Sequence, residues 1–300
     1  MVRMGIFITI LLYSLESLAN RDILFEGYFK ITSEDKHIGY NLVRYEYDTA
    51  KKTFHSTYLT KISNAGNEFM ESVSASAMAD TYMTPIEYKY IGLVGSNSTS
   101  IEATFTKGKK EKDKNKMKIV RTENSKKPVT TNVEIAHDVF LSTFLTYRML
   151  RSELGIQTNS KLNYFAVAEE DGKVVNGKAE VLNEEKYKGF TAFKIKNTFK
   201  DVMFESYVTD KGEALATRVI DARILSELVP KAADAIGTVG LPESIAKRLF
   251  GKVPLGSKNV VTQYFNNKDN APEKGGKTEG FPAGEGIIIS PKDPKKQEGP

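Results

Sequence analysis

Long runs of alternating apolar and polar residues, joined by short turns, restrict this chain more than any other feature of its sequence. The first run starts at Asp22, and turn-forming residues at 33–36, 48–52 and 64–67 separate the runs that follow. An alternation with a period of two is typical of strands that bury one face. Because tight turns join consecutive strands that run in opposite directions, residues 22–121 are predicted to form an antiparallel meander.

Residues 137–153 (HDVFLSTFLTYRMLRSE) carry the one long helical pattern in the middle of the chain. Phe140, Phe144 and Tyr147 recur at intervals of three and four residues, which places them on one face of a helix. Asp138 is predicted to cap the first turn by accepting a backbone N–H. A helix with this many aromatic side chains must bury one face, so we expect it to pack on the sheet.

Strand-like sequence resumes after this helix, at residues 162–220, so the sheet is expected to hold about a dozen strands. Sheets of that size curl, and a helix lying in the concave face fills them. Residues 224–250 form a closing section that ends in a helix, since Pro242 suits a first turn and Gly251 a C-terminal end. Residues 260–265 are expected to be a last strand. The predicted fold class is therefore α+β: a large curved antiparallel β-sheet, or half-barrel, wrapped around a central α-helix.

The first 19 residues have the layout of a secretory signal peptide. A basic start at Arg3 precedes an apolar run at 6–12, and Ser17 and Ala19 are small residues at the two positions that a signal peptidase reads. We expect cleavage after Ala19. The apolar run is shorter than the roughly 20 residues that a membrane span needs. The mature protein is therefore expected to be exported to the periplasm rather than anchored in the membrane.

Residues 266–300 hold five of the ten prolines and six of the 22 glycines, with few bulky apolar residues. Such a composition buries too little surface to offset chain entropy, so this tail is predicted to be disordered. Its apolar triplet at 287–289 either adds as a strand to the sheet edge of a partner or is a passing feature of the tail. Between the signal and the tail, residues 20–265 are expected to form one domain.

The order of these segments resembles a known architecture. A signal peptide precedes a meander whose second strand begins KHIGY (36–40), and a central helix with Asp138, Ser142 and Arg148 precedes a second set of strands. Over residues 20–220 the chain resembles a family of exported bacterial half-barrel proteins, which is similar in architecture to the lipoprotein carriers of the LolA and LolB type. Those carriers hold acyl chains in a curved sheet closed by helices, so the resemblance implies a lipidic ligand. The chain departs from them in having no tryptophan, and no cysteine for a lipid anchor.

Residue types that usually carry catalysis or bind metals are sparse. The absence of cysteine excludes disulfides and thiol chemistry. The three histidines, His37, His55 and His137, do not fall at the spacings of metal ligands. There is no nucleophile elbow, phosphate-binding loop or dinucleotide fingerprint, and the glycine-containing stretch 92–98 is interpreted as a turn. The chain is therefore expected not to be an enzyme and to need no cofactor or metal.

Positive charge is concentrated in residues 107–127, which carry nine lysines and one arginine against three acids. The net charge of this stretch is +7, whereas that of the whole chain is +5, so the remainder is slightly acidic. The stretch either contacts anionic lipid head groups or is a solvated loop whose charges keep a sheet edge from pairing. Nucleic acid is not an expected partner, since no aromatic residues interleave the lysines. The head-group contact would use Lys107, Lys109, Lys110, Lys112, Lys114 and Lys116.

The run at residues 72–79 has small side chains on both faces. Serines at 72, 74 and 76 alternate with Val73, Ala75 and Ala77. Side chains of this size leave volume above the sheet. Either the aromatic residues of the central helix fill that volume, or it is the floor of an apolar pocket. The predicted pocket is lined by Tyr40, Leu42, Val73, Ala75, Ala77, Phe140, Phe144 and Tyr147.

These features together favour a function in binding. The first hypothesis is an exported, non-enzymatic protein of the cell envelope that binds an apolar or lipidic ligand on the concave face of the sheet. The second is a protein-interaction module that uses an exposed sheet edge and the C-terminal tail, without a small-molecule ligand. A hydrolase is the least favoured class, since no base and nucleophile can be paired.

Overall fold

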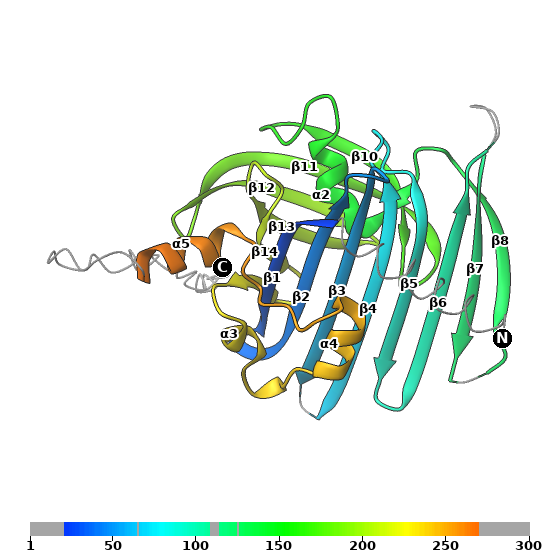
Figure 1. Ribbon diagram of the computed structural model, residues 1–300. Coiled ribbons are helices and arrows are strands. Elements are labelled where there is room, and N and C mark those ends of the chain that lie inside the picture. The colour runs from blue at the N-terminus through cyan, green and yellow to red at the C-terminus, as the bar shows by residue number, and fades with distance from the viewer. Residues whose placement is uncertain (1–20, 65, 109–113, 125, 270–300) are drawn as a thin grey trace, which may run out of the picture.

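The described part of the chain folds around a single sheet of fifteen strands, and Figure 1 shows its arrangement. The structure is a computed structural model that describes residues 21–269, apart from residues 65, 109–113 and 125. The first eight strands are β1 (Arg21–Ser33), β2 (Lys36–Asp48), β3 (Thr53–Asn64), β4 (Asn67–Met78), β5 (Pro85–Val94), β6 (Asn97–Thr106), β7 (Asn115–Glu123) and β8 (Val129–Ile135). The others are β9 (Phe140–Leu141), β10 (Lys161–Ala168), β11 (Lys173–Tyr187), β12 (Phe190–Phe199), β13 (Val202–Val208), β14 (Ala214–Val219) and β15 (Ile224–Val229).

The strand order shows two meanders that meet at the pairing of β1 with β15. From one edge to the other it reads β8-β7-β6-β5-β4-β3-β2-β1-β15-β14-β13-β12-β11-β10-β9. Every pair is antiparallel except β9 with β10, which is parallel. The result is a large, mostly-sheet, barrel-like fold. The predicted antiparallel meanders are confirmed on both sides of the central segment.

Short helices pack on this sheet. They are η1 (Ser142–Phe144), α2 (Leu145–Leu150), α3 (Ala232–Ile236), η2 (Gly237–Val239), α4 (Glu243–Phe250) and α5 (Val260–Asp269). Figure 1 shows α3 and α4 in front of the strands of the first meander, with α5 at the left. None of the helices within the described part of the chain is long and apolar enough to cross a membrane.

The larger core lies between the two meanders. It joins the inward-facing residues of β3–β7 to those of β10–β13, with the segment from Val139 to Met149 between them. A second cluster combines Phe25, Phe29 and Val43 with residues of β12, β14, β15 and α5. The third cluster lies on the other face of β1–β3, where Tyr28, Tyr40, Leu42 and Leu59 meet α3 and α4. The first meander therefore buries apolar side chains on both faces.

The predicted helix at 137–153 is wrong in its extent. Phe140 and Leu141 form β9 instead, because their backbone pairs with Ala166 and Val167 of β10. The α-helix begins only at Leu145 and ends at Leu150. Asp138 does not cap it, since no side chain caps either η1 or α2. A six-residue helix thus lies among the aromatic residues of the core, where a helix about three times as long was expected from their spacing.

Glu169 fixes the start of this segment. Its Oε2 accepts a hydrogen bond from Ser142 Oγ at 2.5 Å, and its Oε1 accepts one from the backbone N–H of Thr143 at 3.1 Å. The residue is only 2% exposed. Burial raises the pKa of the Glu169 carboxyl from 4.5 to about 7, against the lowering effect of these hydrogen bonds.

Replacing this carboxyl is expected to change how stability depends on pH. Because its folded pKa is raised, Glu169 contributes stability that is fully present below about pH 4.5 and is lost as the pH rises through about 7. Wild-type protein should therefore lose about 2–3 kcal/mol more than Glu169→Gln between pH 4.5 and 8. Urea denaturation of both proteins at the two pH values measures this difference, and parallel stability profiles would contradict it. Burial also raises the pKa of Glu71 to about 7, so the stability of both proteins still falls somewhat as the pH rises.

Residues 260–265, predicted as a strand, form the first part of α5. The β-branched pair Val260 and Val261 gave the strand-like pattern. The side chain of Asn259 favours a helix here instead of a strand. Its Oδ1 accepts the backbone N–H of Thr262 at 2.8 Å and so caps a first helical turn. The helix predicted before Gly251 is confirmed as α4, with Gly251 in the left-handed conformation at its C-terminal end. The predicted signal peptide and residues 270–300 of the predicted tail lie outside the described residues.

Candidate functional site: a polar groove beside α4

The structure divides the eight predicted pocket residues between the two faces of the sheet. Six of them, Val73, Ala75, Ala77, Phe140, Phe144 and Tyr147, belong to the core between the meanders. Tyr40 and Leu42 point to the opposite face, where they pack against α3 and α4. The reason is the register of β2, in which Tyr45 and Tyr47 face the inner core and the even-numbered residues face outward. The eight residues therefore do not line one pocket.

Aromatic rings pack over the inner face of the small-residue strand. The ring of Tyr147 lies 5.4 Å from that of Phe54, the residue paired with Ala77. It also lies 4.9 Å from the ring of Tyr45, which in turn lies 6.3 Å from Phe144. Of the two interpretations offered by the sequence, the packed geometry favours aromatic filling over an apolar pocket at Ala75 and Ala77.

A hollow does lie above this strand, but on its serine face. It is a groove of about 520 Å³ across the outer face of the first meander, with the end of α4 as one wall. Its floor consists of two rows of directly paired residues that run from β2 to β6. The first row is Arg44, Thr57, Ser74, Lys89 and Glu102. The second row is Glu46, His55, Ser76, Glu87 and Thr104.

Short side chains at the middle of these rows leave space for the groove. Ser74 and Ser76 extend little from the backbone, so backbone and neighbouring strands line the floor. The end of α4, with Arg248, Leu249 and Phe250, rises at one side. The exposed pair of Lys89 and Glu102, 2.5 Å apart, stands at the other side. The serines of β4 thus leave space above the outer face of the sheet, and mostly polar side chains line that space.

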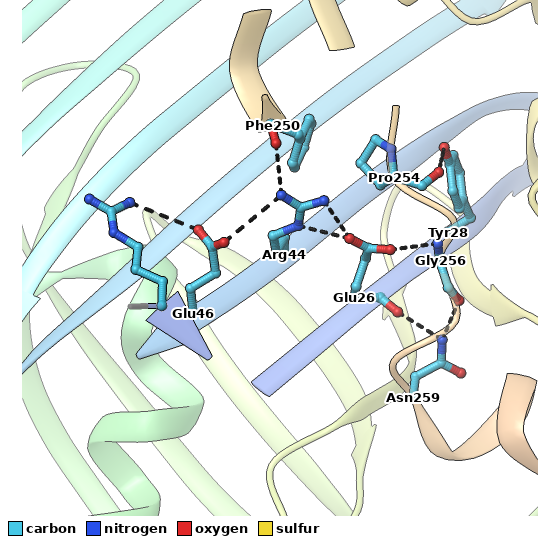
Figure 2. A network of polar contacts seen from close by, with 9 residues as sticks. Glu26, Tyr28, Arg44, Glu46, Phe250, Pro254, Gly256 and Asn259 are labelled. Carbon is cyan, nitrogen blue, oxygen red and sulfur yellow. Dashed lines mark hydrogen bonds and ion pairs between the residues drawn. The ribbon is translucent and has the colours of Figure 1, made fainter. Parts of the chain in front are cut away.

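Arg44 holds the end of α4 against β2, and Figure 2 shows its contacts. Its Nε donates to Glu26 Oε2 at 2.8 Å, and its Nη1 donates to the backbone carbonyl of Phe250 at 2.9 Å. Its guanidinium also lies 5.2 Å from the centre of the Phe250 ring. A cation at the last carbonyls of a helix interacts favourably with the helix dipole. The buried arginine therefore fixes the C-terminal end of α4 to β2.

Glu26 extends the same network to the chain after α4 (Figure 2). Its Oε1 accepts the backbone N–H of Gly256 at 2.7 Å. Asn259 donates to the backbone carbonyls of both Glu26 and Gly256, each at 2.8 Å. Tyr28 donates to the carbonyl of Pro254 at 3.0 Å. The segment between α4 and α5 is thus attached to β1 along its length.

The charges that line the groove are mostly paired. Glu46 lies 3.9 Å from both Arg21 and Arg44, and Glu102 pairs with Lys89. Two exposed residues differ: within the described residues, Arg248 of α4 has no acidic partner and Glu87 of β5 has no basic partner. The groove therefore offers one cation and one carboxylate that a ligand can engage.

His55 in the second row is neutral at physiological pH. Burial and the charge of Arg21 lower the pKa of its imidazole to about 4. Its Nε2 lies 2.9 Å from the hydroxyl of Thr53, so the ring is held by a hydrogen bond. A neutral, oriented imidazole contributes hydrogen-bonding groups to the groove and adds no charge to it.

The groove has hydrogen-bonding groups and charges, but no arrangement that indicates a reaction. The hydroxyl side chains of its two floor rows are those of Thr57, Ser74, Ser76 and Thr104, and none of them has a hydrogen bond to His55 within the described residues. Across the part of the chain that the structure describes, no group of three or more His, Asp or Glu residues could hold a metal ion. The groups that the groove presents are therefore donors and acceptors of hydrogen bonds, together with charged side chains.

The basic stretch runs along the β6–β7 hairpin and β7, beside the end of the groove floor, where Lys118 is paired with Thr104. Lys107, Lys114 and Lys116 are exposed. Lys114 lies 3.9 Å from Glu134 of β8. The other lysines of the predicted head-group contact, Lys109, Lys110 and Lys112, lie outside the described residues.

Sequence patterns did not predict several residues of this site. Glu26 and Arg44 lie 18 positions apart within ordinary alternating strands, and Phe250 is a further 206 positions along. The sequence did contain one signal, a charged residue next to an apolar one within a strand, such as Glu26 after Phe25. A charge that becomes buried at such a position needs a partner. Arg248 and Glu87 carried no signal, because most exposed charges on helices and strands have no specific role.

Comparison with known proteins gives no evidence on function. No protein-family model and no curated protein sequence matches the chain. Among solved structures, a beta-barrel-like protein from Brucella abortus, whose domain is described as being of unknown function, is 10% identical. The match covers 69% of this chain and 97% of that chain, with a TM-score of 0.48. Function is therefore inferred from the groove and its residues.

Proposed function

We propose that this chain is an exported, non-enzymatic binding protein of the cell envelope whose ligand occupies the groove beside α4. The observation that carries the proposal is a polar hollow of about 520 Å³, which lies within the range of small-molecule sites. Its floor of serine and threonine side chains is continuous with a wall that a buried arginine fixes in place. Export is supported by the secretory layout of residues 1–19.

The unpaired charges indicate the class of ligand. Arg248 is suited to a carboxylate or phosphate, which guanidinium groups bind with two parallel hydrogen bonds. Glu87 is suited to an ammonium group. A small zwitterionic ligand, such as a short peptide, satisfies both and can hydrogen-bond to the hydroxyl groups between them. An apolar ligand fits less well, because the inner face that would hold it is packed with Phe54, Tyr45 and Tyr147.

Trialanine and its blocked forms test this assignment. The peptide has one positive and one negative end, whereas its N-acetyl form lacks the cation and its C-terminal amide lacks the anion. We expect isothermal titration to show binding of trialanine, and about tenfold weaker binding of each blocked form, because each loses one charge-assisted hydrogen bond.

Variants at α4 identify the charge that is used. Arg248→Gln should weaken trialanine binding about tenfold but leave binding of the amide form unchanged, since the amide has no carboxylate to lose. Lys247→Gln is the matched control, because Lys247 is the neighbouring exposed cation but pairs with Glu243 and does not line the groove. Equal effects of the two variants, or no difference among the three peptides, would contradict the proposed ligand class.

A further inference from the structure

Strand β8 forms one edge of the fifteen-stranded sheet. Within the described residues it pairs only with β7, through an unbroken register from Asn115–Ile135 to Arg121–Val129. Six of its seven residues are exposed, and only Ile135 is buried. Figure 1 shows it as the outermost strand at the right, far from the helices that cover the first meander. The backbone of β8 therefore has one free side.

This edge lacks the features that usually prevent pairing with another strand. Protected edges carry lysines, prolines, bulges or inward-pointing charges. Within its seven residues, β8 has no lysine, no proline and no register shift against β7. Its only charge is Glu134. At the opposite edge of the sheet, β9 is two residues long and pairs only with Ala166 and Val167 of β10. The uncovered residues 161–165 of β10 are fewer and begin with a lysine, so β8 is the longer unprotected edge within the described residues.

We propose that a second copy of this chain pairs with β8, through an antiparallel contact between the two β8 strands centred on Asn132. This register pairs all seven residues, and it continues each face of the sheet from one copy into the same face of the other. Thr131 of one copy then faces Val133 of the other, and Val129 faces Ile135. Val129 and Val133 are 64% and 36% exposed in the single chain, so pairing covers apolar surface as well as backbone groups.

The charges near β8 favour this antiparallel arrangement. Lys126 and Lys127 precede the strand, whereas Glu134 and Asp138 lie at its other end. Antiparallel pairing brings the basic end of one copy to the acidic end of the other, and it places the two copies of Glu134 apart. A parallel pair would align like charges. The arrangement is also a two-fold contact, in which each copy offers the same surface, as in most homodimers.

Single cysteines provide a register-specific test, because the natural chain has none. In the proposed pair, residue 132 faces itself at a Cα separation of about 4.5–5.5 Å, which a disulfide can bridge. Residue 130 faces residue 134, so two copies of residue 130 are about 14 Å apart. In the full chain oxidised with copper phenanthroline, Asn132→Cys should form a disulfide-linked dimer about tenfold faster than Thr130→Cys. Equal rates, or faster linkage at 130, would overturn the proposed contact.

Sedimentation of the unlinked protein completes the test. Wild type should show a monomer–dimer equilibrium, and Asn132→Lys should shift it to monomer, since two lysines would then face each other at the centre of the pair. Asn176→Lys makes the same change on an exposed residue of β11, which is not an edge strand, and should leave the equilibrium unchanged. A wild-type protein that stays monomeric at every concentration would refute pairing with a second copy. This holds even if the monomer binds a strand of another protein at β8.

Discussion

Arg44→Met is expected to lower the free energy of unfolding by about 3–5 kcal/mol, because it leaves a buried carboxylate without its cation. The side chains of Arg44 and Glu26 are 5% and 6% exposed, and their closest atoms are 2.6 Å apart. The same change removes the donor to the carbonyl of Phe250. Urea denaturation at pH 7 measures the loss, and hydrogen exchange should show faster opening of α4.

Two further variants separate the ion pair from general effects of substitution. Glu26→Gln combined with Arg44→Met should recover much of the loss, since replacing both members of a buried pair costs far less than removing one. Lys89→Met removes a cation from the exposed pair with Glu102 and should cost less than about 1 kcal/mol. If Arg44→Met costs no more than Lys89→Met, Arg44 does not hold α4 against the sheet.

Local patterns were sufficient to predict most of the sheet. Alternation and tight turns located the strands from β1 to β7 and from β10 to β14, because both signals are short-range. Alternation did not reveal β9, whose two residues pair with β10 through a contact that is distant in sequence. The same contact shortened the predicted central helix. The side chain of Asn259 likewise turned a strand-like run into α5, so specific hydrogen bonds overrode propensity at both places.

The candidate site was harder to predict for a physical reason. The small residues of β4 suggested space above the sheet, but a period of two does not say which face is filled when both faces carry small side chains. The core covers one face of the first meander, and α3 and α4 cover the other face over β1–β3. Aromatic rings fill the inner face, and the position of α4, fixed by Arg44 and Glu26, bounds the space that remains beside the serines.

Substitutions on the two faces of β4 should therefore have opposite effects. Ser74→Leu places a larger side chain in the groove, so it should abolish trialanine binding while changing stability by less than about 0.5 kcal/mol. Ala77→Leu adds the same kind of side chain on the inner face, where Ala77 is fully buried and its neighbours are packed. Overpacking there should cost about 1–3 kcal/mol and leave peptide binding intact.

Parallel titrations of wild type, Ser74→Leu and Ala77→Leu test the central claim most directly. Each protein is titrated with trialanine and with a fluorescent fatty acid, and its stability is measured by urea denaturation. Binding in the groove predicts that wild type and Ala77→Leu bind trialanine, that Ser74→Leu does not, and that the fatty acid binds to none of them. The opposite result would be that the wild type binds the fatty acid and that Ala77→Leu abolishes this binding at little cost in stability. That result would contradict binding in the groove and place the ligand on the inner face.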